Sequence, residues 1–453
     1  MSNKTFYAID LFAGCGGLSE GFIQAGFEVI AQVEMEKWAC ETLSTRHIYH
    51  TTKRIGKDHF YHKYLKGEIT KEYLLNKFPE IAKLISSGVI QSEFGKTKLE
   101  DILKKIEMTM KYHKVSKLSV VIGGPPCQPY SLAGRARDPD RMKNDERHFL
   151  YEHYLKILEH LRPDFFVFEN VPGLITAKSK GEEIFLKILD DFRNISTPYE
   201  IAPSFDEYYE NPREYLLDSS KYGVPQKRKR VIFVGYRKSL LRQNKNVQDV
   251  FKNILTAEKP RYAGYTVTDA VGDLPPLKPG EGNDCWFGEY DGDSITPYQQ
   301  KMRQCSQAII NYRARTHMEG DLKRYKFFIE HHKNGNGAAT LKDLISERPD
   351  LIPDHNNLDE FIDRFKVQWW HQPASTIMSH ICKDGHYYIH PDLSQCRSFT
   401  VRESARCQSF PDNYLFEGPR TEQFRQVGNA VPPMLAKVIA TSILKELNKI
   451  YNS

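Results

Sequence analysis

The sequence has few of the features that mark secreted, metal-binding or membrane proteins. Its 453 residues include eight cysteines, none of which forms a CxxC pair, so neither a disulfide framework nor a metal site is expected. No long apolar run suggests a membrane span, and the first residues, MSNKTFYAIDLF, do not have the layout of a signal peptide. We therefore expect a protein of a reducing, intracellular compartment without a membrane partner.

The chain also lacks a strong excess of one charge. The net charge of +6 is modest for this length, but the basic residues are unevenly spread. Lys and Arg strongly outnumber Asp and Glu between Lys301 and Lys342, and QKRKR at 226–230 is a second basic cluster. Local basic surface favours a polyanionic partner such as a nucleic acid, although solvated helix faces carry similar clusters.

Short apolar segments alternate with helical patterns in the first half of the chain. A helix is predicted over 149–161, and the predicted strands are FYAIDLF (6–12), EVIAQVE (28–34), KLSVVI (117–122), DFFVFENV (164–171) and RVIFVGY (230–236). Such alternation predicts a parallel α/β sheet whose sites lie at the carboxyl ends of the strands. The Lys-rich, helical stretch 50–115 resembles an insertion within this domain.

The alternation ends after Tyr236. Residues 238–395 are rich in Pro, Gly, Asn, Tyr and His, and the section 371–390 has the pattern of β-hairpins. We predict two domains. The first comprises residues 1–237 and is completed by 426–453, which contain a strongly amphipathic helix. The second, residues 238–425, is expected to be smaller, mixed and β-rich.

A glycine-rich turn follows the first predicted strand. In DLFAGCGG, Gly14, Gly16 and Gly17 would let a ligand approach the backbone and the start of the next helix. Glu34 ends the second strand, where an acidic side chain binds ribose hydroxyls in nucleotide-binding sheets. The spacing is not that of the dinucleotide fingerprint, which favours a nucleoside ligand without a pyrophosphate, such as S-adenosylmethionine (AdoMet).

The segment GGPPCQPYSLAG (123–134) places Cys127 directly after two prolines at the end of a predicted strand. Proline fixes the backbone, so the pair would hold the sulfur in one position. A free thiol has a pKa of about 8.5, so attack at neutral pH requires activation of the thiol or of its target. Glu169, at the end of another strand, could supply this activation by donating a proton to a ring nitrogen.

Six segments in this order resemble the DNA (cytosine-5) methyltransferases of bacterial restriction–modification systems. They are DLFAGCGG, GGPPCQPYS, FENV, QKRKR, RSFTVRESARCQSFPD and QVGNAVPP, and they span residues 6 to about 440. The resemblance implies a Rossmann-like, AdoMet-dependent methyltransferase domain and a smaller target-recognition domain, with DNA held between them. It also implies methyl transfer to carbon 5 of a cytosine that is flipped out of a specific short double-stranded DNA sequence.

The resemblance also assigns roles to individual residues. Cys127 would attack carbon 6 of the cytosine, Glu169 would bond ring nitrogen 3 and the exocyclic amine, and Arg228 or Arg230 would contact the base and its phosphate. AdoMet would be lined by Phe12, Ala13, Gly14, Gly16, Gly17, Glu34, Met35, Glu93, Leu150, Asn429 and Val431. DNA would be contacted by Gln128, Ser131, Arg147 and Gln226.

Two positions depart from the pattern of the family. The family has an acidic residue at the end of the third strand, and Glu68, Glu93 and Asp101 all compete for this place. We favour Glu93, because an apolar run precedes it. The aromatic residue expected after Glu34 is replaced by Met35, which can still pack on a ring.

Other functions remain open on the sequence alone. An RNA (tRNA) cytosine-5 methyltransferase of the same family is the main alternative, and a non-catalytic nucleic-acid-binding relative is another. A nicotinamide dehydrogenase does not fit the glycine spacing. The expected partner is double-stranded DNA, with a cognate restriction endonuclease that would act independently. We expect a monomer in the cytoplasm of a bacterium, associated with the nucleoid.

Overall fold

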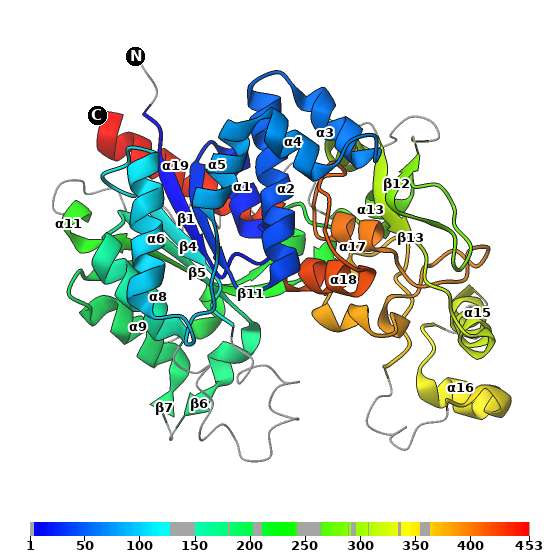
Figure 1. Ribbon diagram of the computed structural model, residues 1–453. Coiled ribbons are helices and arrows are strands. Elements are labelled where there is room, and N and C mark those ends of the chain that lie inside the picture. The colour runs from blue at the N-terminus through cyan, green and yellow to red at the C-terminus, as the bar shows by residue number, and fades with distance from the viewer. Residues whose placement is uncertain are drawn as a thin grey trace.

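The computed structural model describes residues 4–126, 150–179, 182–202, 211–241, 264–288, 290, 296–306, 308–333, 337–353 and 363–452. Four predicted site residues lie outside these ranges: Cys127, Gln128, Ser131 and Arg147. The described chain forms two lobes, and both termini lie on the lobe that contains the large sheet (Figure 1). We call this part the sheet lobe and residues 264–430 the second lobe.

An eight-stranded sheet is the centre of the sheet lobe. Its strand order is β3-β2-β1-β4-β5-β11-β8, and β9 also pairs with β11. The strands are β1 (Tyr7–Leu11), β2 (Glu28–Glu34), β3 (Val89–Gln91), β4 (Val120–Gly123), β5 (Phe165–Asn170), β8 (Tyr199–Ala202), β9 (Leu216–Asp218) and β11 (Lys229–Arg237). All five predicted strands are therefore confirmed.

The direction of β11 corrects the expectation of a parallel sheet. The five neighbouring strands β3, β2, β1, β4 and β5 are parallel to one another. Strand β11 runs antiparallel to β5, β8 and β9. Strand β9 precedes β11 in the chain and pairs with the first residues of β11. Strand β11 therefore begins at the edge of the sheet where β4 and β5 end. A strand that enters from this edge must run against the parallel set.

Helices cover both faces of the sheet, because alternate strand residues are apolar on both sides. Phe166 and Phe168 of β5 pack on one face, and Phe165 and Val167 pack on the other. The first face is covered by α6 (Leu99–Tyr112), α8 (Leu150–Leu161) and α9 (Ile184–Asn194), and the second by α1 (Gly17–Ala25) and α19 (Pro433–Asn452). The predicted helices over 149–161 and at the C-terminus are thus confirmed.

The stretch predicted as an insertion is only partly one. It contributes helices that pack beside the sheet, but it also contains β3, which is an edge strand of the sheet itself. The helices are α2 (Lys37–Arg54), α3 (Asp58–Leu65), α4 (Lys71–Lys77) and α5 (Pro79–Gly88). Their apolar core also includes Ile310 of the second lobe, so these helices connect the two lobes.

The second lobe is less rich in strands than expected. Its described residues form one two-stranded antiparallel sheet and a short strand that pairs with β10 of the sheet lobe. These strands are β12 (Gly282–Gly288), β13 (Ile309–Arg313), β14 (Ala374–Ser375) and β10 (Gln226–Lys227). The helices are α13 (Val267–Val271), α14 (Pro297–Arg303), α15 (Glu319–Lys333), α16 (Leu341–Glu347), α17 (Val401–Cys407) and α18 (Arg420–Asn429).

The section 371–390 does not form the predicted hairpins. Within it lie only β14 and two 3₁₀ turns, Ser379–Cys382 and His386–Tyr388. Its backbone groups bond distant segments instead: the Ala374 amide donates to the Pro225 carbonyl, and the Ile389 amide donates to the Lys366 carbonyl. Long-range pairing has replaced the local pairing that a hairpin needs.

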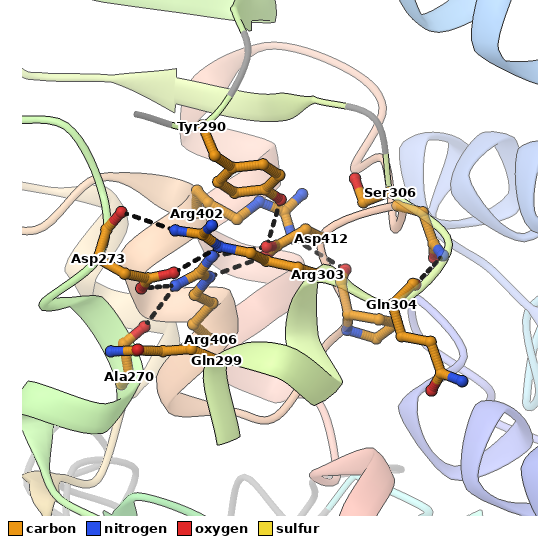
Figure 2. Close-up of polar contacts among 12 residues, drawn as sticks. Ala270, Asp273, Tyr290, Gln299, Arg303, Gln304, Ser306, Arg402, Arg406 and Asp412 are labelled. Atoms are coloured by element: carbon orange, nitrogen blue, oxygen red, sulfur yellow. Dashed lines mark hydrogen bonds and ion pairs between the residues drawn. The ribbon is translucent and has the colours of Figure 1, made fainter. Parts of the chain in front are cut away.

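Buried arginines stabilise the second lobe (Figure 2). The guanidinium of Arg406 on α17 donates to both carboxylate oxygens of Asp412, at 2.8 and 2.6 Å, and it also pairs with Asp273 after α13. Arg303 on α14 donates to the second oxygen of Asp273 at 2.8 Å, and Tyr290 donates to Asp412 at 2.5 Å. One polar network therefore links three helices and the 411–416 segment.

The chain passes from the second lobe back to the sheet lobe at residues 430 and 431. Val427 and Ala430 pack in the core of the second lobe, whereas Val431 packs with α1 and α19. The stretch Arg420–Tyr451 is apolar and long enough to cross a membrane by length and composition alone. However, 67% of its most apolar window is buried, and α19 packs along α1, which is typical of a core helix.

Candidate functional site at the carboxyl edge of the sheet

The turn after β1 is fixed by the carboxylate at the end of β2. The Gly14 amide donates to Glu34 Oε2 at 2.7 Å, and the amides of Met35 and Glu36 donate to Oε1 at 2.8 and 2.9 Å. Burial raises the pKa of Glu34, although the three amide donors oppose this shift. These contacts hold the Glu34 carboxylate at the strand ends, where the sequence predicted it.

The three glycines of this turn have different roles. A Cβ at Gly17 would lie 2.2 Å from the Val431 carbonyl oxygen, and one at Gly16 would lie 2.7 Å from Leu43 Cδ2. These two glycines allow close packing of the chain on itself. A Cβ at Gly14 would meet no atom within 4 Å, so only Gly14 borders open space that a ligand could enter.

The end of β3 carries the acidic residue that we favoured. Glu93 lies two residues after the end of β3, and the residue between them, Ser92, donates its amide to the Glu34 carbonyl at 2.9 Å. Glu68 lies after α3, and Asp101 lies in the first turn of α6, so neither ends a sheet strand. Glu93 is paired with Lys96 at 2.9 Å.

Phe94 is a residue of this edge that the sequence analysis missed. Its ring packs on the ring of Phe12, with centroids 4.3 Å apart. The signal was an aromatic residue directly after a strand-end carboxylate. The pair gives this edge an aromatic surface one strand away from Glu34.

The other predicted cofactor residues lie around the same edge with different exposure. Leu150 is buried at the start of α8, and its side chain reaches toward Gly95. Met35 is 48% exposed after β2, and Asn429 is exposed at the end of α18. Buried residues here are Ala13, whose amide donates to the Val33 carbonyl, and Val431.

A second group of side chains lies at the ends of β4 and β5 and at the start of β11. Arg230 Nε donates to Glu169 Oε1 at 2.8 Å, and both side chains are nearly buried. Glu169 pairs in register with Ile232, so Arg230 lies just beyond the end of β5. The guanidinium of Arg230 therefore faces the carboxylate directly.

Glu169 also contacts the loop that leads to Cys127. A Cβ at Gly124 would lie 2.5 Å from Glu169 Oε2, so the carboxylate occupies the space that any larger residue would need. Asn170 donates to the Pro125 carbonyl at 3.3 Å, and its own Oδ1 accepts from the Val171 amide. The end of β5 thus holds the segment Gly124–Pro125, which begins three residues before Cys127 in the sequence.

Arg228 does not share the position of Arg230. Its guanidinium is fully buried and donates to the backbone carbonyls of Ile377 at 2.7 Å and Gly428 at 3.1 Å. Burial, and then the neighbouring charge of Arg230, hold its pKa well below the usual value. Arg228 joins the two lobes, and of the two arginines only Arg230 contacts Glu169.

Gln226 is also buried, which disagrees with its predicted role as a DNA contact. Its Nε2 donates to the Cys407 carbonyl and to Gln408 Oε1, and its Oε1 accepts from the Ile377 amide. All of these partners are protein groups of the second lobe. The physical reason is that β10 lies between the lobes, so the Gln226 side chain bonds across the junction, whereas its neighbour Lys227 is exposed.

One edge of the sheet therefore carries two neighbouring groups of residues. Glu34, Glu93 and the Phe12–Phe94 pair surround the ends of β1 to β3, and Glu169 with Arg230 lies at the end of β5 and the start of β11. The fold and this arrangement are those of an α/β methyltransferase. The chain belongs to the C-5 cytosine-specific DNA methylase family, whose model matches residues 6–79 and 87–445.

Similar proteins cover nearly the whole chain. The Type II methyltransferase M.Bpa9945I of Bacillus paralicheniformis is 39% identical over an alignment of 458 positions, gaps included, which covers 97% of this chain and 99% of that protein. The Type II methyltransferase M.DdeI of Desulfomicrobium norvegicum is 29% identical and covers 96% of this chain and 88% of its own length.

A solved structure has the same fold. It is described as that of a protein proposed to be a DNA modification methyltransferase, encoded within a prophage (E. coli). The match has a TM-score of 0.63 and 24% identity, and it covers 98% of this chain and all of that chain.

Proposed function

We propose that this protein transfers a methyl group from AdoMet to carbon 5 of a flipped cytosine in a specific short sequence of double-stranded DNA. The family and the Type II relatives support modification within a restriction–modification system. The observation that carries the chemical part is the contact of the Glu169 carboxylate with Gly124 and Arg230, at the start of the loop that leads to Cys127.

The residues around β1 to β3 fit AdoMet. Gly14 borders open space, Glu34 offers a carboxylate to ribose hydroxyls, and the Phe12–Phe94 pair offers an apolar surface for a purine ring. Glu93, Met35, Leu150 and Asn429 would complete the proposed site. AdoMet supplies the electrophilic methyl group of the reaction.

The chain itself would activate the cytosine. The base must leave the helical stack to be reached, and Glu169 would then hydrogen-bond ring nitrogen 3 and the exocyclic amine. The Cys127 thiolate adds to carbon 6, which makes carbon 5 nucleophilic enough to accept the methyl group. Loss of the carbon 5 proton and elimination of the thiolate restore the aromatic ring. We propose Arg230 rather than Arg228 as the arginine at the base.

The remaining proposals concern partners and location. Gln128, Ser131 and Arg147 remain proposed DNA contacts on the segment that contains Cys127. The second lobe would read the DNA sequence, with residues 238–425 as the recognition domain. We propose a monomer that acts in the bacterial cytoplasm on nucleoid DNA, independently of any cognate endonuclease.

The first test is methylation in a cell that has none of its own. The protein is expressed in a methylation-free bacterial host, and the host DNA is sequenced after bisulfite treatment, with Cys127→Ser as the control. We expect protected cytosines in one short recurring sequence with the wild type only. Methylation of tRNA without protection of duplex DNA would overturn the DNA assignment in favour of the RNA alternative.

A further inference from the structure

A hollow of about 490 Å³ lies beside the proposed catalytic residues, on the other face of the sheet. Its floor is apolar and comes from Pro172, Ile175 and Leu216. Its rim is basic, because Arg213, Lys221 and Lys229 line it and all three are exposed. The lining of the hollow is thus an apolar surface surrounded by cationic side chains.

The hollow is close to Glu169 along the chain and across the sheet. Lys229 is the neighbour of Arg230 on β11, and successive strand residues point to opposite faces. Arg230 reaches Glu169 on one face, so Lys229 projects from the other face at the same edge. The segment that begins at Pro172 follows β5 directly, only three residues after Glu169.

The charge of the lining is positive, with three cations and one carboxylate. Asp218 is the one carboxylate that lines the hollow, and its Oδ1 accepts from the amide and the hydroxyl of Ser220. Among the described residues, neither Arg213 nor Lys229 forms an ion pair. The three cations of the hollow outnumber its one carboxylate, which is opposite Lys229 across β9 and β11, so the hollow attracts anions, and the edge of the sheet is where the DNA would lie.

These features fit the sugar–phosphate backbone of DNA better than a base. Most protein–DNA hydrogen bonds go to phosphates and sugars, chiefly from Arg and Lys. An apolar floor suits the sugar carbons, and the cations suit the phosphates on either side. The hollow offers Thr176 as the one neutral side-chain hydroxyl on its lining, so it has little with which to distinguish bases.

We propose that Arg213, Lys221 and Lys229 bind backbone phosphates of the DNA strand beside the flipped cytosine. The inference rests on the proposed function, which supplies the DNA. Contacts of this kind add affinity without sequence preference. They would anchor the strand while its target nucleotide turns toward Glu169.

The test compares two triple variants of equal charge. The first combines Arg213→Gln, Lys221→Gln and Lys229→Gln. The control combines Lys104→Gln, Lys111→Gln and Lys114→Gln. These lysines are exposed on or just after α6, which leads to the start of β4, at the edge of the sheet opposite the strand ends (Figure 1). Binding of labelled duplexes with and without the mapped site is measured over a series of salt concentrations, and AdoMet binding is measured alongside.

Each lost phosphate contact makes the negative slope of log K against log salt shallower by about 0.9. The slope of the first variant should therefore be shallower than that of the wild type by up to about 3. We expect equal losses on both duplexes, unchanged AdoMet affinity, and a control that matches the wild type. The proposal is overturned if the first variant has the slope of the control, or if it weakens only the duplex that carries the site. A wild type that binds neither duplex would overturn the proposed function as well.

Discussion

The two lobes are held together by different kinds of contact. The sheet lobe has two continuous apolar layers, one on each face of its strands. The second lobe has smaller apolar clusters, and Arg397, Arg402 and Arg406 are fully buried among them. Residues that carry the proposed chemistry lie on the lobe whose core is regular and apolar.

This difference has a functional consequence. Strand ends on a close-packed sheet are rigid, so they can hold reacting groups at fixed separations. A lobe built from short elements can change its surface more freely while its polar network keeps the fold. We therefore expect substitutions in the sheet edge to alter chemistry and substitutions in the second lobe to alter stability or DNA choice.

The largest effect is expected at Cys127. Cys127→Ser removes the thiolate, so methyl transfer should fall by a factor on the order of 10⁴ or more. AdoMet affinity should stay near that of the wild type, since Cys127 is not one of the proposed cofactor residues. Turnover and AdoMet binding are measured on the same preparation, and comparable loss of both would contradict the assigned role.

The next largest effect is expected in the second lobe. Arg406→Met leaves Asp273 and Asp412 buried without their main counter-charge, and removal of one partner from a buried ion pair costs about 3–5 kcal/mol. The free energy of unfolding is measured with denaturant. Arg425→Gln is the control, because Arg425 pairs with Glu422 on the surface of α18, and it should change stability by less than about 0.5 kcal/mol. Equal effects of the two variants would show that the buried network does not stabilise the lobe.

The sequence predicted the sheet lobe well because its signals are local. Runs such as VVIG in β4 and FFVF, the first four residues of β5, are apolar along their whole length, as buried parallel strands require. Glu34 and Glu169 could be predicted because each directly follows such a run. The direction of β11 could not, since it depends on the edge from which the chain enters.

The second lobe could not be predicted in the same way. Its helix α17 carries Arg402 and Arg406, which a sequence pattern assigns to a solvated face, yet both are buried by partners far along the chain. The same reason explains the two misplaced residues of the junction. Nothing local in QKRKR tells that Gln226 and Arg228 point inward while Arg230 reaches the site.

Acid should weaken the second lobe through Glu403. Burial acts to raise its pKa, but the charge and hydrogen bonds of Arg397 outweigh burial and lower the pKa to about 2. A carboxyl group whose pKa is lowered on folding stabilises the fold above its unfolded pKa of about 4.3, and this stability is lost as the pH falls toward 2. The loss should be about 3 kcal/mol, by the linkage between pKa and stability.

The control for this prediction separates Glu403 from its neighbour His390, which lies 3.5 Å away. Burial lowers the pKa of His390 to about 4. The unfolded chain therefore takes up this proton first as the pH falls, and the fold loses stability between about pH 6.5 and 4. Unfolding free energies of the wild type and Glu403→Gln are measured from pH 7 to pH 2. The variant should still lose stability above pH 4, as the wild type does, but should lose little more below pH 4. Parallel curves of unfolding free energy against pH for the two proteins would contradict the role of Glu403.

The smallest effect is expected at Gly14, and it separates fold from cofactor binding within the sheet lobe. Its φ of 54° is left-handed, so Gly14→Ala should cost about 1–2 kcal/mol of stability. Gly56→Ala is a matched control, because Gly56 also has a left-handed φ of 68°, and neither position has an atom within 4 Å of an added Cβ. The two variants should therefore lose similar stability, but only Gly14→Ala should weaken AdoMet binding, by roughly tenfold, since its methyl group would enter the proposed cofactor space. Calorimetric titration with AdoMet measures the difference, and equal affinities for the two variants would remove Gly14 from the cofactor site.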